Sequence, residues 1–345
     1  MALALARSLV EADEYDAERV ADAYARWYES APFDMGSTTT RALSKASVAR
    51  KAGAGTAVAA HRAANRESQA NGALMRVSPL GVYGAGFRTC DVFFGQIDAS
   101  LTHPHAVCCD ASGWMAAVLA HAIREGGSAS EVYGYGRKLS AERELARPVR
   151  MAIAKAETAP PGNYVSKQGW VLIALQNACY QLLHAEGPED GIRDTVRRGG
   201  DTDTNAAIAG ALLGAVHGRD AIPQQWRDRI LTCRPIQGLD GVERPRPPEY
   251  WPVDALALAE RLLLAGEAGR KATRGAGPLP AERVRFEFAR EFSAAEFAKV
   301  KAGFPPDWDA KWGITYREPW LTFFRSWTGL CFTVCGWSLY TEAPR

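Results

Sequence analysis

The segment Gly199-Gly200-Asp201-Thr202-Asp203-Thr204-Asn205 leads directly into an apolar run of small residues from Ala206 to Val216. The glycine pair allows the backbone to turn, and the run that follows predicts a helix beginning at this point. Two carboxylates and two hydroxyls lie within four positions. A hard divalent cation such as Mg²⁺ or Mn²⁺ prefers such oxygen ligands and needs neither a thiol nor an imidazole. The segment therefore predicts a metal site at the start of a helix.

A helix cap is the alternative explanation for these acidic residues. Asp or Thr before an alanine-rich run usually serves as an N-cap, so Asp201 or Asp203 could have that role alone. One cap accounts for only one carboxylate. The second carboxylate, the paired threonines and the glycine pair would then have no explanation, and this favours the metal site.

Composition limits the class of function. The chain has 345 residues and a formal net charge of +2, and it has no long run of Lys or Arg. We therefore do not expect nucleic acid as a partner. No apolar run is as long as a membrane span and the first residues do not form a signal peptide, so we expect no membrane partner. The seven cysteines are an odd number without zinc-finger spacing, which indicates reduced thiols in a cytoplasmic protein.

The first three quarters of the chain have helical periodicity, which predicts an all-α globule with its site in the loops. Pro104 suits the first turn of a helix that ends at Gly126-Gly127, and this places His103 at the helix N-terminus, facing the loops. In the helix after the acidic segment, the small residues Ala206, Gly210 and Gly214 recur every four positions. This stripe allows another helix to approach closely.

The character of the sequence changes after residue 265. Residues 266–282 are rich in Gly, Ala, Pro and charge, which is typical of a linker. Apolar alternation in residues 283–345 then predicts a small α+β module that contains half of the ten tryptophans. A Trp-rich patch can bind a ligand or a partner, but in so small a module aromatic residues usually form the core.

Five separate stretches of the chain together resemble a known family. They are Asp34-Met35-Gly36-Ser37-Thr38-Thr39, Asn71-Gly72-Ala73-Leu74-Met75-Arg76, Thr102-His103-Pro104-His105 with Asp110, Gly169-Trp170 through Gln176-Asn177, and Gly199 through Ala215. Each is weak alone, whereas their order and spacing are specific. Over residues 1–265 the chain resembles bacterial ADP-ribosylglycohydrolases of the dinitrogenase-reductase-activating type. The resemblance implies an all-α hydrolase that removes ADP-ribose from a modified protein side chain or small molecule.

The resemblance also implies a site. Asp201, Asp203 and Thr204 would supply metal ligands, while Asn71, Gly72, Arg76 and His103 would line the ADP-ribose pocket. The residues themselves suit these roles, because Gly72 allows close backbone approach to a phosphate, Asn71 can pair with a ribose or a base edge, and Arg76 can neutralise a diphosphate. Without the resemblance, a plain turn at Asn71-Gly72 and a helix cap at His103 are the favoured explanations.

The implied chemistry is metal-assisted hydrolysis of a glycosidic bond. A binuclear Mg²⁺ or Mn²⁺ site would hold the hydroxyls of the distal ribose and polarise a water, while a carboxylate assists at the anomeric carbon. No redox cofactor is needed. We expect a monomer whose C-terminal module is not required by the pocket.

One departure from the family concerns the start of the chain. Family members place a second acidic cluster, Thr-Asp-Asp-Thr, just before a helix that reads like Met1-Ala2-Leu3-Ala4-Leu5-Ala6. The resemblance implies that the usual catalytic carboxylate lies in that upstream cluster, and Asp34 is the first substitute to consider. Two alternatives to the enzyme therefore stay open: a non-catalytic ADP-ribose-binding protein, and a structural, crystallin-like protein.

Overall fold

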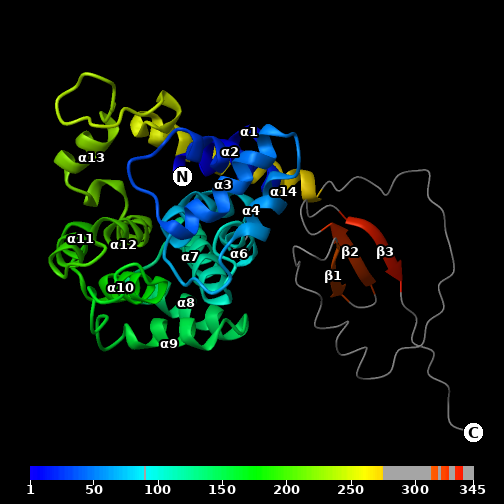
Figure 1. Ribbon diagram of the computed structural model, residues 1–345. Coiled ribbons are helices and arrows are strands. Elements are labelled where there is room, and N and C mark those ends of the chain that lie inside the picture. The colour runs from blue at the N-terminus through cyan, green and yellow to red at the C-terminus, as the bar shows by residue number, and fades with distance from the viewer. Residues whose placement is uncertain (89–90, 275–311, 318–319, 326–330, 337–345) are drawn as a thin grey trace, which may run out of the picture. The chain divides into compact units, whose positions relative to one another are not determined.

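The computed structural model describes the whole chain except residues 89–90, 275–311, 318–319, 326–330 and 337–345. The chain forms two compact units, Met1–Arg270 and Lys271–Arg345. The first unit is all-α, as the sequence predicts (Figure 1).

The helical unit consists of α-helices joined by short loops and single 3-10 turns. Its α-helices are α1 (Ala2–Ala12), α2 (Ala17–Glu29), α3 (Ser37–Lys51), α4 (Thr56–Ala63), α5 (Ser78–Phe87), α6 (Phe93–Ser100), α7 (Ala106–Glu125), α8 (Ala129–Glu142), α9 (Arg147–Lys155), α10 (Val171–His184), α11 (Pro188–Arg197), α12 (Thr202–His217), α13 (Gln224–Leu231) and α14 (Ala255–Arg274). The 3-10 turns are η1 (Leu74–Arg76), η2 (Arg219–Ala221), η3 (Pro248–Tyr250) and η4 (Pro252–Asp254).

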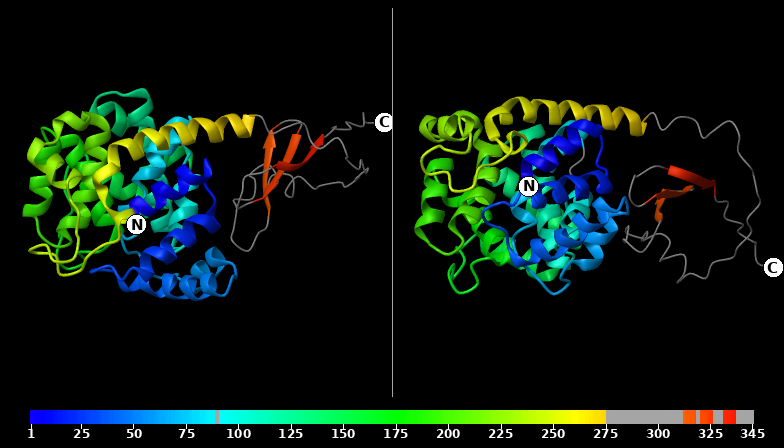
Figure 2. Two further views of the ribbon diagram at one scale, coloured as in Figure 1. Left: turned by 90° about the horizontal axis from the view of Figure 1, so that it is seen from above. Right: turned by 45° about the horizontal axis from the view of Figure 1, so that its top comes forward.

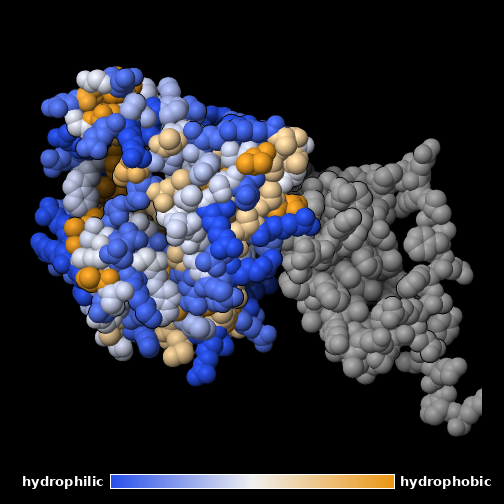
Figure 3. All heavy atoms as spheres, in the orientation of Figure 1, coloured by the Kyte–Doolittle hydropathy of each residue, from blue (hydrophilic) through white to orange (hydrophobic). Residues whose placement is uncertain are grey.

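Helix α7 is the central helix of this unit and packs against α5, α6, α8, α10 and α12. Its Trp114 is fully buried, and the indole Nε1 donates a hydrogen bond of 2.8 Å to the carbonyl oxygen of Gly136 on α8. By length and hydropathy α7 could span a membrane, contrary to the expectation that no apolar run is long enough, yet 72% of its apolar window is buried inside the unit. The face of the unit in Figure 3 is largely hydrophilic, with scattered apolar spots.

Small residues set the spacing between helices, as the stripe on α12 predicts. A Cβ added to Gly210 would lie 3.2 Å from Cδ1 of Ile192 on α11. Gly81 on α5 is closer still to α7, because an added Cβ would lie 2.4 Å from the Cβ of Leu119. A larger side chain at either glycine would therefore push the two helices apart.

Helix α14 continues to Arg274, beyond the point where the sequence predicts a linker (Figure 2). The physical reason is close helix packing rather than flexibility. A Cβ added to Gly266 would lie 2.2 Å from the carbonyl oxygen of Tyr83, and one added to Gly269 would lie 2.5 Å from the Tyr83 hydroxyl. These glycines let α14 lie against α5, and the rest of the predicted linker, residues 275–282, is outside the described residues.

The second unit contains a three-stranded antiparallel sheet in the order β1-β2-β3. Its strands are β1 (Trp312–Arg317), β2 (Trp320–Arg325) and β3 (Cys331–Gly336), with Ile314 opposite Phe323 and Thr322 opposite Val334. The register shifts between Phe323 and Phe324. The first part of the predicted α+β module, residues 283–311, lies outside the described residues.

Candidate functional site

The acidic segment forms a tight turn before α12. Gly199 and Gly200 both have φ of +76°, a left-handed conformation that side chains other than glycine rarely adopt. A Cβ on Gly200 would lie only 2.0 Å from the carbonyl oxygen of Tyr164. Glycine is therefore required at position 200 for two reasons, the backbone angle and the close approach of a second segment. Asp201 follows directly and occupies the N-cap position of α12.

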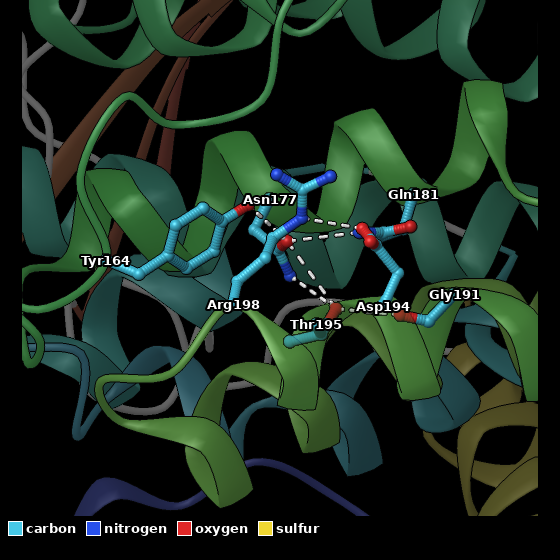
Figure 4. Close-up of polar contacts among 7 residues, drawn as sticks. All are labelled: Tyr164, Asn177, Gln181, Gly191, Asp194, Thr195 and Arg198. Atoms are coloured by element: carbon cyan, nitrogen blue, oxygen red, sulfur yellow. Dashed lines mark hydrogen bonds and ion pairs between the residues drawn. The ribbon is translucent and has the colours of Figure 1, made fainter.

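A buried polar network holds the second segment in place (Figure 4). The Tyr164 hydroxyl donates to Oδ1 of Asn177 at 2.8 Å, and Nδ2 of Asn177 donates to Oγ1 of Thr195 at 3.0 Å. Asn177 and Thr195 are both fully buried, on α10 and α11. Arg198 packs its guanidinium over the Tyr164 ring and donates from Nε to Oδ2 of Asp194 at 2.6 Å. The network thus fixes the carbonyl against which the glycine turn packs.

Asn71 and Asp201 are brought together although 130 positions separate them in the sequence. Nδ2 of Asn71 donates to Oδ2 of Asp201 at 2.7 Å. The Asn71 loop is held by short strand-like pairing, in which its backbone N–H donates to the carbonyl oxygen of Gly169 at 2.9 Å and Ala70 forms a bridge with Trp170. The predicted ligand loop and the predicted metal loop are therefore neighbours.

His103 lies on the other side of this loop. The imidazole is 1% exposed and faces the loop that contains Gly72, just before the start of α7, in keeping with the predicted position at a helix N-terminus facing the loops. A Cβ added to Gly72 would lie 3.0 Å from both Cε1 and Nε2 of the ring, and 3.3 Å from Oγ1 of Thr39. Burial, with a smaller contribution from the positive charge of Arg76, lowers the pKa of His103 to about 3. The ring is therefore neutral at physiological pH.

Arg76 is directed into the core. Its side chain is 1% exposed, Nε donates to Oδ2 of Asp98 at 2.9 Å, and Nη1 donates to Oγ1 of Thr102 at 2.8 Å. Tyr24 completes the cluster, with its hydroxyl donating to Oδ1 of Asp98 at 2.7 Å and its ring 4.6 Å from the guanidinium carbon. Burial alone would lower the pKa of Arg76, but the Asp98 carboxylate raises it above its usual range. The guanidinium is thus used inside the protein, whereas the sequence suggested contact with a diphosphate.

The polar side chains at the start of α12 include those of Asp201, Asp203 and Asn205. Asp201 makes no capping hydrogen bond through its side chain, so the N-cap alternative does not account for its carboxylate. Asp203 is exposed, and its Oδ1 accepts from the backbone N–H of Thr204 at 2.8 Å. Asn205 is fully buried, and neither polar atom of its amide has a hydrogen-bond partner in the described part of the chain.

The number of carboxylates limits the kind of metal site. Among the described residues, no group of three or more His, Cys, Asp or Glu side chains could hold a metal ion. Mg²⁺ usually keeps several waters and needs only one or two carboxylates, so Asp201 and Asp203 with the Thr204 hydroxyl fit part of the ligand shell of one such ion.

A hollow of about 650 Å³ lies beside the Asn71 loop. Its lining residues are Glu67, Gln69, Ala70, Ser166, Lys167, Gln168, Gly169 and Trp170. The Trp170 indole Nε1 donates to Oε1 of Gln69 at 2.9 Å, and the Lys167 ammonium lies 5.4 Å from the ring centre. The hollow therefore combines an aromatic surface with a cation next to the candidate site.

Some residues of the site were not predicted from the sequence. They are Asp98 and Tyr24, which contact Arg76 in the buried cluster, and Tyr164, whose carbonyl oxygen packs against Gly200. A signal for Asp98 does exist, since it is a single carboxylate in the otherwise uncharged helix α6. Asp34, the predicted substitute base, is exposed in the loop before α3.

The chain is similar to a family model and to several known proteins. The family model for ADP-ribosylglycohydrolase matches residues 1–272. A putative ADP-ribosyl glycohydrolase L543 of Acanthamoeba polyphaga mimivirus is 31% identical over 261 residues, which cover 68% of this chain and 74% of that protein. The ADP-ribosyl-[dinitrogen reductase] glycohydrolase of Rhodospirillum rubrum is 26% identical over 67% of this chain and 71% of its own.

Two further relatives extend the comparison. The ADP-ribosylarginine hydrolase Tri1 of Pseudomonas putida is 24% identical over 76% of this chain and 69% of its own. A solved structure described as an ADP-ribosylglycohydrolase-related protein complex has a TM-score of 0.55 and 23% identity, and the match covers 78% of this chain and 79% of that chain. At this identity the structural likeness shows the fold alone.

Proposed function

Because the chain belongs to the ADP-ribosylglycohydrolase family, we propose that it hydrolyses the glycosidic bond between ADP-ribose and an arginine side chain of a modified protein. Relatives named for ADP-ribosylarginine and for dinitrogen reductase support this substrate class. The observation that carries the proposal is the hydrogen bond between Asn71 and Asp201, because it joins a loop suited to a ligand with a loop suited to a metal.

The metal ligands proposed are Asp201, Asp203 and Thr204, for Mg²⁺ or Mn²⁺. When bound, the ion would orient the ribose hydroxyls and stabilise negative charge on the attacking oxygen. The side-chain amide of Asn71 donates a hydrogen bond to Oδ2 of Asp201, and this fixes the orientation of the carboxylate and therefore the direction of Oδ1. Gly72 lets the ligand approach the backbone closely, since a side chain there would meet His103 and Thr39.

The base that delivers water to the anomeric carbon is a separate question. We propose Asp34 as the candidate to test among the described residues. It lies three positions before α3, and the first turn of α3 reaches the site, because Thr38 Oγ1 lies 2.8 Å from the Ser68 hydroxyl and Thr39 lies against Gly72. An exposed carboxylate on that loop is available to a water molecule in the pocket.

A second candidate function is ADP-ribose binding without hydrolysis. The small number of carboxylates among the described residues favours it, since two carboxylates hold one divalent ion more readily than two. Binding and hydrolysis are measured separately, so the two functions can be distinguished.

The experiment uses a protein carrying ADP-ribosyl-arginine and follows release of free ADP-ribose by chromatography, with ADP-ribose binding measured by calorimetry. We expect release in Mg²⁺, its loss in EDTA, and a fall of at least 100-fold in Asp201→Ala. The matched control is Asp228→Ala, at an exposed aspartate on α13, which should retain activity. Both variants should keep the helical circular dichroism of the parent.

The outcomes decide between the candidates. Binding without release in the unmodified protein would replace hydrolysis by the binding function. Absence of both binding and release would reject the proposed function. Full activity of Asp34→Asn would remove that residue as the base while leaving the hydrolase proposal standing.

A further inference from the structure

Thr102 links the buried ion pair to His103. Its hydroxyl is fully buried and has two side-chain partners in the described chain, Nη1 of Arg76 at 2.8 Å and Nδ1 of His103 at 2.7 Å. A guanidinium can only donate, so the threonine oxygen accepts from Arg76. The proton of the Thr102 hydroxyl then still needs a hydrogen-bond acceptor.

The position of that proton fixes the histidine tautomer. If Nδ1 carried a proton, it would also donate to the threonine oxygen, and the buried hydroxyl proton would have no acceptor. If the hydroxyl instead donates to Nδ1, every group of Thr102 is satisfied. The neutral ring then carries its own proton on Nε2.

The Nε2 edge of the ring faces the candidate ligand loop. Nε2 and Cε1 of His103 are the ring atoms nearest to the position of a Cβ on Gly72, and no hydrogen-bond partner of Nε2 is found among the described residues. A donor on a side chain that is 1% exposed therefore points to the loop that also contains Asn71. Nε2 is not among the fully buried polar atoms that lack a partner in the described chain, so an acceptor on a ligand can reach its N–H.

We propose that Arg76 and Thr102 are positioning residues: the chain Asp98–Arg76–Thr102 holds His103, which the resemblance already assigns to the ADP-ribose pocket, in the tautomer protonated on Nε2, so that this N–H is directed to an oxygen of bound ADP-ribose. This proposal rests on the proposed function for the identity of the ligand. His103 contacts the ligand, whereas Arg76 and Thr102 are positioning residues. Arg76 thus acts on the ligand indirectly, through two hydrogen bonds, and not by contact with a phosphate.

The tautomer is tested first, in the unmodified full chain. Nitrogen-15 NMR of histidine-labelled protein distinguishes a protonated ring nitrogen from an unprotonated one, and His103→Gln identifies the signals of residue 103. We expect a protonated Nε2 and an unprotonated Nδ1. The opposite pattern would overturn the relay, whether or not the protein binds ADP-ribose.

The link to the ligand is tested with Thr102→Val, which has the shape of threonine but no hydroxyl. We expect mixed tautomers and about tenfold weaker ADP-ribose binding by calorimetry. Thr102→Ser should restore both, since it returns the hydroxyl. The matched control is Thr232→Val, at an exposed threonine whose hydroxyl donates to the backbone carbonyl oxygen of Asp228, and it should change neither.

The results separate this inference from the proposed function. An unchanged tautomer and unchanged affinity in Thr102→Val would refute the relay. The expected tautomer without any ADP-ribose binding by the parent protein would refute the proposed ligand, and with it the second half of the inference, while the relay itself would stand.

Discussion

The buried, neutral state of His103 should make the helical unit sensitive to mild acid. Folding holds the pKa of His103 at about 3, compared with 6.5 for an ordinary histidine, because burial and the nearby Arg76 charge oppose protonation. The pKa is lowered in the folded state, so the unfolded chain binds the proton first as pH falls below 6.5. Acid therefore pulls the equilibrium toward unfolding, and the loss grows until the pH reaches the folded pKa.

The size of the effect follows from these two pKa values. At pH 7 the unfolded chain carries little charge on this ring, and the free energy of unfolding is lowered by only about 0.2 kcal/mol. At pH 5 the unfolded ring is almost fully protonated while the folded ring is not, and the reduction is about 2 kcal/mol. This change in the free energy of unfolding hardly depends on the pKa of His103 in the folded protein, provided that this pKa lies well below 5.

The assay compares the parent protein with His103→Gln, which cannot take up the proton. Urea unfolding followed by circular dichroism at pH 8, 7, 6 and 5 gives the free energy of unfolding of each protein. Between pH 7 and pH 5 we expect the free energy of unfolding of the parent to fall by about 2 kcal/mol more than that of the variant. Between pH 8 and pH 7 the free energies of the two proteins should change by the same amount. Other titrating groups are common to both proteins and cancel in the comparison. Parallel behaviour over the whole range would refute the reasoning, because it would mean that folded His103 takes up a proton as easily as the unfolded chain.

Two further predictions concern backbone and charge. Gly199 and Gly200 have the same left-handed φ, but only a Cβ at position 200 would lie 2.0 Å from the Tyr164 carbonyl oxygen. Thermal unfolding should therefore show a loss of stability of about 1 kcal/mol for Gly199→Ala and of about 3 kcal/mol or more for Gly200→Ala. Equal losses in the two variants would contradict the close approach at Gly200. Arg76→Met leaves the carboxylate of Asp98 buried without its cation, and urea unfolding should show a loss of stability of about 3–5 kcal/mol. Adding Asp98→Asn to the same chain should recover part of this loss, because it removes the buried charge. A loss below about 1 kcal/mol in Arg76→Met would show that the ion pair is not buried as described.

The helical architecture could be predicted because its signals are local. The apolar periodicity and the glycine pair place the start of α12 correctly, since capping and helix formation depend on neighbouring residues. The end of α14 could not be predicted in the same way. Gly266 and Gly269 resemble a flexible linker in the sequence, but each allows a helix to approach Tyr83, a residue about 180 positions earlier.

The candidate site was predictable in its residue types and less so in its geometry. Asp201 was identified from its chemistry, and Asn71 and Gly72 from the family resemblance; the structure brings Asn71 into hydrogen-bond contact with Asp201. Arg76 was expected at a diphosphate because the resemblance places it in the pocket and its positive charge can neutralise a diphosphate. Its burial depends on Asp98, and no local pattern around Arg76 reveals that a carboxylate 22 positions away will pair with it.

The arrangement of the three loops explains why a site so dispersed in the sequence can be held accurately. Asn71 is fixed by backbone pairing with Gly169, and Asp201 is fixed by the glycine turn against Tyr164. Both anchors therefore lie in one segment, residues 162–170, whose own position is set by the buried Asn177 network (Figure 4). A shift of that segment would move the ligand loop and the metal loop together. The contact between Asn71 and Asp201 is thus maintained by a common support, and its geometry depends more on the buried network than on either loop alone.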